Sequence, residues 1–219
     1  MIQAVLFDID GTLIDSNTLH VAAWAEVFAD AGHTVARDAI AGQIGKGGDN
    51  LVPTLIPGID EDAVEALSDA HGVTYKARHI AQAKPFADAR ALLERVHADG
   101  RMVVLASSAS AEELDHYVGL MGVAHLVAAR TSSDDVATTK PAPDIFAVAL
   151  EKAGVAAEAA VAVGDTPYDV MAAGKAGVAT VAVLSGGFPE ARLRAAGAVA
   201  VYADVAALLA DYENSALAR

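Results

Sequence analysis

The chain of 219 residues contains no cysteine, and this absence removes several kinds of chemistry at once. Without thiols there are no disulfides, no thiolate metal sites and no cysteine nucleophile. The cysteine count therefore does not indicate whether the protein works in a reducing or an oxidising compartment. Aromatic residues are also scarce, at 5% of the chain. Hydrophobic residues nevertheless make up 54%, which is ample for one large domain or for one domain that carries a smaller insert.

Basic residues are few as well. Lys and Arg total 15 against 29 Asp and Glu, which gives a formal net charge of -14 and a pI of about 4.7. Such a charge repels nucleic acid and anionic lipid over most of the surface, so neither is an expected partner. A small phosphate ester can still bind where a local group of cations and backbone N–H groups overrides the global field.

No apolar run approaches the roughly 18 residues that a transmembrane helix needs. The N-terminus, MIQAVLFDIDG, also lacks the basic region and long apolar stretch of a signal peptide. We therefore expect a cytoplasmic protein that does not enter a membrane. Composition leaves both a monomer and a homodimer open.

Short apolar runs recur along the chain, and most are separated by stretches with helical periodicity. The runs are Ala4 to Phe7, Met102 to Ala106, Leu126 to Ala128, Ala160 to Val163, Ala179 to Leu184 and Ala198 to Tyr202. The helical stretches include Ala87 to Ala98, Ala111 to Tyr117, Pro143 to Ala153, Tyr168 to Ala176 and Pro189 to Ala195. Continuous rather than alternating hydrophobicity indicates strands that are buried on both faces. The sequence therefore predicts an α/β fold with a Rossmann-like parallel sheet covered by helices.

One segment interrupts this alternation. Residues 16–83 contain no convincing strand, and helices are predicted over Leu19 to Ala31 and Asp60 to Ile80. We expect a helical cap domain at 16–83, inserted into a catalytic core of residues 1–15 and 84–219. An insert after the first strand lies over the carboxyl edge of the sheet, where open α/β folds bind ligands.

The first predicted strand ends in two acidic residues, Asp8 and Asp10. Strand side chains alternate with a period of two, so both carboxylates are expected on one side while Ile9 packs on the other. Gly11 then permits a tight turn out of the sheet. Taken alone, such a pair is most often only an acidic strand end.

A second apolar strand ends in Gly164 and Asp165, and Asp169 follows four residues later. If both strand ends meet at one edge of the sheet, four carboxylates surround one point. Like charges in partly desolvated surroundings raise pKa values or require a cation, and Mg²⁺ with its preference for oxygen ligands is the simplest answer. An ordinary turn is the alternative for Gly164 and Asp165 alone.

Two further segments offer what a phosphate group needs. Ser107 follows a strand and precedes a helix that begins near Ser110, so its hydroxyl and the neighbouring N–H groups, with Ser108, are candidates for binding phosphate oxygens. Serines in this position are also ordinary helix caps. Lys140 precedes prolines that stiffen its loop, although a lone lysine there is usually just solvated.

These four segments, in this order, resemble the motifs of the haloacid dehalogenase superfamily over essentially the whole chain. The matching motifs are DIDGT at Asp8 to Thr12, Ser107, Lys140 before PAPD, and GDTPYD at Gly164 to Asp169. The resemblance implies that Asp8 attacks phosphorus to form an aspartyl phosphate, while Asp10 protonates the leaving oxygen and later activates water.

The resemblance also implies a ligand set and a phosphate site. Magnesium is expected at the Asp8 carboxylate, the Asp10 backbone carbonyl and Asp165, with Asp169 supporting that shell. Ser107 is expected to hold the transferring phosphoryl group, and Lys140 to balance charge between that group and Asp8. Thr12 and Ser108 complete the candidate phosphate-binding residues.

Within the superfamily, Asp10 argues against halide displacement and phosphonate cleavage, because relatives with those activities lack this second aspartate. The segment from Asp15 to His20, with Trp24, resembles β-phosphoglucomutases and sugar phosphatases alike. His20 is a candidate substrate-site residue near the hinge, although His20 and Trp24 are also four apart on a helix and equally fit a core.

The glycine-rich segment Ile44 to Leu51 is the candidate substrate loop, and Lys46 is its candidate contact to a substrate anion. The segment is not a nucleotide P-loop, because the upstream glycine is absent and Gly47 stands where Ser or Thr is required. It also lacks the arginine that β-phosphoglucomutases carry there. The favoured function is a magnesium-dependent phosphatase of the phosphoglycolate or sugar phosphate type, acting on a small phosphorylated metabolite, with a β-phosphoglucomutase-like phosphomutase as the alternative.

A non-enzymatic alternative is a receiver-like domain that accepts phosphate. Response-regulator receivers gather acids, a hydroxyl and a lysine around magnesium too. A receiver needs only about 120 residues, has no cap, and carries its phosphorylated aspartate after a later strand. The acidic pair at the end of the first strand and the long helical segment behind it make a receiver-like domain the remote alternative.

Overall fold

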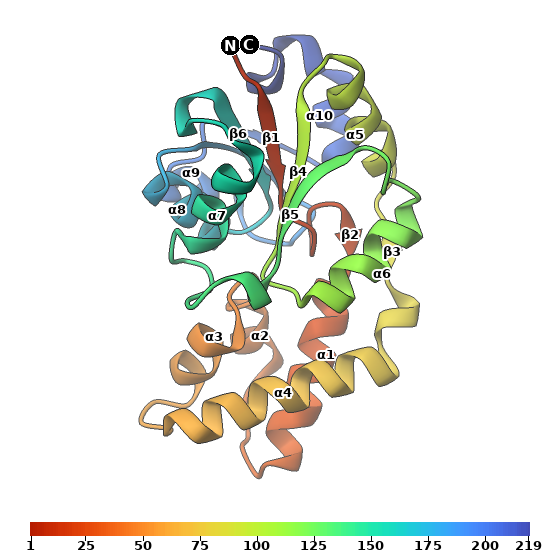
Figure 1. The fold of residues 1–219 in the computed structure, drawn as a ribbon. Helices are drawn as coiled ribbons and strands as arrows, with labels where there is room; N and C mark the ends of the chain where they lie inside the picture. Colours follow the sequence, from red (N-terminus) through yellow and green to blue (C-terminus); the bar gives the residue numbers. More distant parts are fainter.

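The computed structural model describes residues 1–219, with a layered α/β part above and a group of helices below it (Figure 1). The α/β part is built on a parallel six-stranded sheet in the order β5-β4-β1-β6-β7-β8. Its strands are β1 (Ala4–Phe7), β4 (Met102–Ala106), β5 (Val127–Thr131), β6 (Ala160–Gly164), β7 (Ala179–Val183) and β8 (Ala200–Tyr202). The strand order reverses around β1, so its carboxyl end lies at the point where such sheets bind ligands.

Helices cover both faces of this sheet. Val5 and Phe7 of β1 belong to one hydrophobic cluster, and Ala4 and Leu6 belong to another, as the alternation of side chains along a strand requires. The first cluster includes residues of α5 (Ala89–Ala98), α6 (Ala111–Met121) and α10 (Val205–Ala210). The second includes residues of α7 (Asp144–Ala153) and α8 (Pro167–Lys175), and α9 (Glu190–Ala196) packs beside α8. All four residues of β1 are fully buried, which makes this strand a rigid support for the acids that follow it.

The helical part below the sheet has a core of its own. Its helices are α1 (Asn17–Asp30), α2 (Arg37–Ala41), α3 (Gly48–Leu55) and α4 (Glu61–Arg78), followed by a 3₁₀ turn at Ile80–Gln82. Trp24, Phe28, Ile40, Leu51 and Leu67 are among the buried residues of a separate hydrophobic cluster. Two short strands, β2 (Ile14–Asp15) and β3 (Lys84–Pro85), pair antiparallel where the chain enters and leaves this part. We therefore propose residues 16–83 as the cap domain and residues 1–15 with 84–219 as the catalytic core.

The structure confirms the predicted fold class, an α/β parallel sheet with a helical insert. The strand bounds agree with the prediction to within two residues except at β5, which begins one residue later than Leu126 and continues three residues past the predicted end, to Thr131. Its residues alternate between partly buried and exposed, since β5 is an edge strand, and the continuous apolar run ends before the strand does. No helix combines the length and apolar character needed to cross a bilayer.

Candidate active site

The carboxyl end of β1 presents Asp8 at the edge of the sheet. The Asp8 N–H donates to the Val163 carbonyl at 2.9 Å, so the ladder with β6 continues as far as this residue. Ile9 is fully buried, and Gly11 follows with a φ of +76°. A Cβ at Gly11 would overlap both Asn17 and Asp165, so glycine is required here by backbone conformation and by space.

Lys140 lies in the centre of the site and is 1% exposed. Its Nζ pairs with the Asp8 carboxylate, lies 2.7 Å from Asp169 Oδ1 and donates to the Ala106 carbonyl at 3.0 Å. Burial disfavours the charged ammonium, but Asp169 and Asp8 outweigh it and raise the pKa of Lys140. The lysine is therefore a permanent positive charge beside the carboxylate expected to act as nucleophile.

Three buried carboxylates converge beside this lysine. Oxygen atoms of Asp8, Asp165 and Asp169 all lie within 4.8 Å of one another. Burial raises the pKa of Asp8 to about 7, with a further increase from Asp169 and an opposing effect of Lys140. Burial and the neighbouring acids raise the pKa of Asp165 well above its ordinary value. Three carboxylates against one ammonium group leave an excess of two negative charges, which a divalent cation would neutralise.

Local hydrogen bonds orient these acids. Thr12 Oγ1 donates to Asp165 Oδ1 at 2.8 Å and approaches Asp8 Oδ2 at 3.3 Å. Thr166 is the N-cap of α8, and its N–H and hydroxyl donate to Asp169 Oδ2 at 2.9 and 2.7 Å in a capping box. The second oxygen of Asp169 is thereby left facing Lys140. The side chain of Asp169 therefore both caps the start of α8 and contributes a carboxylate to the acidic group beside Lys140.

The side chain of Asp10 is not part of the group of three converging acids and has partners of its own. Asp10 Oδ1 accepts from Ser16 Oγ at 2.5 Å and contacts His20 Nε2 at 3.2 Å. Burial favours the neutral acid, but His20 and Ser16 outweigh it and lower the pKa of Asp10. His20 is held in turn by His71, at 3.3 Å from its Nδ1, and by stacking on Tyr75 at 3.8 Å between ring centroids.

Three serines follow β4, and only Ser110 caps the next helix. Ser107 is 1% exposed, and its Oγ accepts from the Ala109 N–H at 3.0 Å. Ser110 is the N-cap of α6 and forms a capping box with Glu113. Ser108 lines the cavity, and its Oγ is buried without a hydrogen-bond partner. An unpaired buried hydroxyl at this position is available to a phosphate oxygen.

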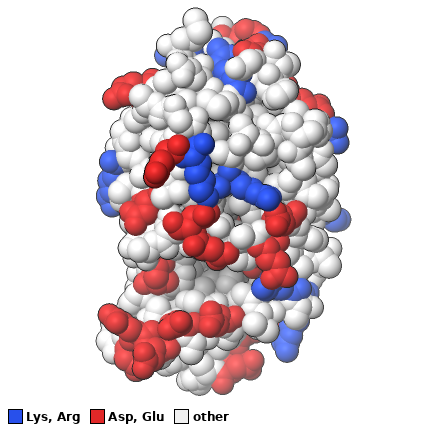
Figure 2. All heavy atoms as spheres, viewed as in Figure 1, with Lys and Arg blue, Asp and Glu red and all other residues white.

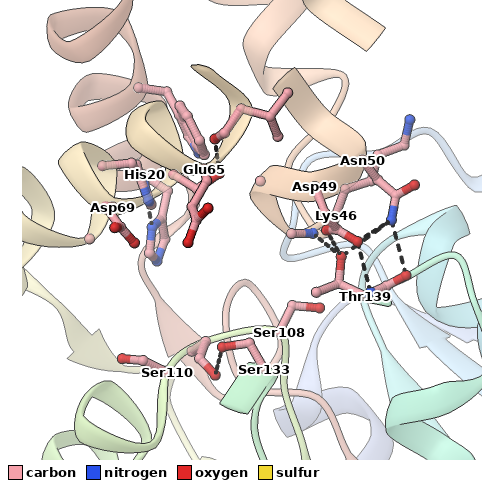
Figure 3. Close-up of a pocket in the computed structure, with 18 of the residues that line it drawn as sticks. His20, Lys46, Asp49, Asn50, Glu65, Asp69, Ser108, Ser110, Ser133 and Thr139 are labelled. Atoms are coloured by element: carbon pink, nitrogen blue, oxygen red, sulfur yellow. Dashed lines mark hydrogen bonds between the residues drawn. The ribbon is translucent and has the colours of Figure 1, made fainter. Parts of the chain in front are cut away.

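A cavity of about 1360 Å³ separates the cap from the core and reaches Asp8 and Asp10. The hollow is visible in Figure 2, with Asp and Glu side chains along its rims, and several of its lining residues are drawn in Figure 3. Its acidic lining residues are Asp8, Asp10, Asp49, Glu61, Glu65, Asp69, Glu113 and Asp134. Its lysines are Lys46 and Lys76, and Lys76 is paired with Glu112 at 2.6 Å. Predicted site residues that do not line the cavity are Thr12, Ser107, Lys140, Asp165 and Asp169.

Lys46 belongs to the cap wall of this cavity. Its Nζ donates to Thr54 Oγ1 at 3.2 Å and lies 4.8 Å from the centre of the Tyr168 ring. Burial lowers the pKa of Lys46. The structure therefore places Lys46 in the wall of this cavity, in contact with Thr54 of the cap and Tyr168 of the core.

Several residues that shape the site have no motif in the sequence. Asn17 Nδ2 donates to Asp165 Oδ2 at 3.0 Å, and the Asn17 Oδ1 atom is buried without a partner. Gly186 lies so close to the Asp165 carboxylate that a Cβ would overlap it. Ser16 is the N-cap residue of α1, a position that serine favours. Asn17, His71 and Gly186 become functional neighbours only through folding.

Comparison with known proteins agrees with this geometry. The family model described as haloacid dehalogenase-like hydrolase matches residues 5–183. A phosphoglycolate phosphatase from Rhodospirillum rubrum is 30% identical over 217 residues, covering 95% of this chain and 90% of the relative. A pyrophosphatase, PpaX, from Halalkalibacterium halodurans is 26% identical over 187 residues, covering 83% of each chain. The crystal structure of a hydrolase from Pseudomonas syringae superposes with a TM-score of 0.90 at 29% identity, covering 97% of this chain and 98% of that one.

Proposed function

This chain belongs to the haloacid dehalogenase-like hydrolases, and we propose that it is a magnesium-dependent phosphatase that releases phosphate from a small phosphorylated metabolite through an aspartyl phosphate. The observation that carries the proposal is the position of Asp8, which lines the cap–core cavity and is paired with the buried Lys140. Its place at the end of a rigid central strand suits a nucleophile that must meet phosphorus in line.

The residues present fit a magnesium ion. Carboxylate oxygens are the ligands that this hard cation prefers, and the ionised Asp8, Asp165 and Asp169 carry two more negative charges than Lys140 neutralises, which equals the charge of the ion. We propose that Asp8 and Asp165 hold the ion together with the Asp10 backbone carbonyl, and that Asp169 supports them through Lys140. When bound, the ion supplies positive charge that stabilises the phosphoryl oxygens in the transition state.

In the proposed first step, a carboxylate oxygen of Asp8 forms a bond to phosphorus as the bond to the ester oxygen breaks. Asp10 donates its proton to the departing oxygen. A phosphate that enters the cavity raises the pKa of Asp10, because a second negative charge disfavours the ionised carboxylate. Lys140 balances the charge of Asp8, and Ser107 and Ser108 hold the phosphoryl oxygens after β4.

In the second step, Asp10 takes a proton from water, whose oxygen attacks phosphorus and breaks the bond to Asp8. Ser16 and His20 keep the Asp10 carboxylate in place for both proton transfers. Closure of the cap strengthens these interactions, since a unit charge pair at 4 Å is worth about 1 kcal/mol in water and about 4 at an effective dielectric of 20.

The charge of the cavity limits the substrate body. Glu65 and Asp69 line it from α4, have no ion-pair or hydrogen-bond partner, and face the cavity in Figure 3. These carboxylates would repel a second anionic group on the substrate. Of the two lysines that line the cavity, only Lys46 is not already paired with an acid and could offset this repulsion. We therefore expect an uncharged body, as in a sugar monophosphate, to be preferred over phosphoglycolate or pyrophosphate. The same repulsion counts against the bisphosphate intermediate of a β-phosphoglucomutase-like alternative.

The proposal is tested by measuring phosphate release with and without magnesium, over a panel of hexose phosphates, phosphoglycolate, pyrophosphate and β-glucose 1-phosphate. Hydrolysis of a panel member that requires both magnesium and Asp8 would support the phosphatase. Conversion of β-glucose 1-phosphate to the 6-phosphate without phosphate release would establish the phosphomutase instead. A protein that accepts phosphate on Asp8 without turnover would match the receiver-like alternative, which membership in a hydrolase family disfavours.

Lys46→Ala is expected to raise KM about tenfold while lowering kcat by less than about threefold. The lysine lines the cavity and makes no contact with Asp8 or Lys140, so we expect its ammonium group to donate hydrogen bonds to the substrate body and to add little that is specific to the transition state. Steady-state kinetics on the best panel substrate measure the effect. Arg37→Ala, which removes an exposed charge from the same cap, is the matched control. An unchanged KM for Lys46→Ala would remove this residue from the substrate site.

A further inference from the structure

One loop of the cap makes several hydrogen bonds to Thr139 of the core. Thr139 donates its N–H to Asp49 Oδ2 at 3.0 Å, and its hydroxyl donates to Asp49 Oδ1. The Gly47 N–H donates to Thr139 Oγ1 at 2.9 Å, and Asn50 Nδ2 donates to the Thr139 carbonyl at 3.2 Å. Figure 3 shows Asp49 and Asn50 of the cap reaching Thr139 of the core at one side of the cavity. Both backbone polar groups of Thr139 and its hydroxyl are thus committed to the cap.

The loop is shaped for this approach. A Cβ at Gly47 would overlap the Thr139 side chain, and a Cβ at Gly45 would overlap Thr166. Thr166 caps the helix that carries Asp169. The loop therefore docks on the two core segments that bear Lys140 and Asp169. Lys46 stands between the two glycines, so the docked backbone also determines where this lysine meets the cavity.

The partner of Asp49 is the residue directly before Lys140. Lys140 is held at its ammonium end by Asp8, Asp169 and the Ala106 carbonyl. Asp49 has no Lys or Arg partner, so its carboxylate is satisfied by Thr139 and the neighbouring Asn50 amide. Charge-assisted hydrogen bonds to a carboxylate are about twice as strong as neutral ones, so the charge of Asp49 strengthens this contact between loop and core.

We propose that Asp49 is a positioning residue that fastens the cap to the core when the site is closed, placing Lys46 at the substrate and steadying the Lys140 loop. The role rests on the proposed phosphatase function. Asp49 touches neither substrate nor metal and acts through Thr139. Opening the cap to exchange substrate and product requires these hydrogen bonds to break in each turnover.

The test combines kinetics with hydrogen exchange on the full-length protein. Asp49→Ala and Thr139→Val are each expected to lower kcat/KM about tenfold or more, mainly through kcat, because less of the enzyme is closed. The double variant should be no worse than the poorer single variant, since both remove the same contact. Thr139→Ser keeps the hydroxyl and should recover most of the activity. Asp30→Ala, an exposed acid of the cap, is the matched control and should retain full activity.

Amide exchange is measured without substrate, so it reports on the contact even if no panel compound is hydrolysed. The amides of residues 47–50 and 139 should exchange about tenfold faster in Asp49→Ala, while those of β1 and β6 stay unchanged. Unchanged exchange in this loop would show that the contact does not hold the cap and would overturn the proposal. Faster exchange with wild-type kcat/KM on a hydrolysed compound would overturn the positioning role.

Discussion

Asp8→Asn is expected to lower the rate of phosphate release by about 10⁴-fold or more, because an amide cannot supply the carboxylate oxygen that bonds to phosphorus. The fold should survive. Asparagine has nearly the same shape as aspartate, and Lys140 keeps Asp169 as its charged partner at 2.7 Å. Removing one of three converging carboxylates also relieves repulsion in the metal-free protein. Phosphate-release kinetics and thermal unfolding followed by circular dichroism measure both effects.

The control for Asp8→Asn is Asp30→Asn, the same chemical change at an exposed position of α1. Intact mass should show that the variant carries no phosphoryl group after exposure to substrate. Activity within about tenfold of wild type would exclude the covalent mechanism, whereas loss of activity together with loss of the unfolding transition would assign Asp8 a structural role only.

Asp10→Asn is expected to lower steady turnover by about 10²- to 10⁴-fold, the usual contribution of a general acid and base. Asparagine can still accept from Ser16 and His20, so the local structure should persist, but it can transfer no proton. Water attack on the aspartyl phosphate depends on the base, and phosphorylated enzyme should therefore accumulate. Intact mass spectrometry after mixing with substrate would detect the added phosphoryl group.

An activated ester separates the two roles of Asp10. With p-nitrophenyl phosphate the leaving group needs little protonation, so the variant should release about one equivalent of nitrophenolate quickly and then stall. The double variant Asp8→Asn/Asp10→Asn provides the control, because it has no nucleophile and should show no burst. Turnover of the single variant at the wild-type rate on both ester types would remove Asp10 from the chemistry.

The central strands were predictable because their sequence and their environment agree. β1 and β4 coincide with the predicted runs, since strands covered on both faces need apolar residues throughout. The edge strand β5 was predicted with the wrong bounds. The two-residue strands β2 and β3 at the cap junction were not predicted. Their residues form strands because of neighbours that are distant in sequence, and local periodicity carries no record of those neighbours.

Asp169 shows what a local sequence pattern can predict and what it cannot. Its spacing from Thr166 marks a capping box, so its place in the first turn of α8 is a local property. That its second oxygen meets Lys140 depends on the packing of α8 against the segment before α7. Asp10 lines the same cavity as Asp8, as alternation along the strand predicted, but its hydrogen bonds to Ser16 and His20 could not be read from that alternation.

The sequence by itself determined the α/β class, the position of the helical insert and the acidic strand ends, because hydrophobic periodicity and chain order are local properties. Only the tertiary structure decided which acids converge, that Lys140 is buried among them, and that Asp49 joins the cap to Thr139. The physical reason is distance along the chain. Contacts such as Asp8 with Lys140 and Asp49 with Thr139 join residues that are far apart in the sequence, and they form only after the hydrophobic cores of cap and sheet have brought the backbones together.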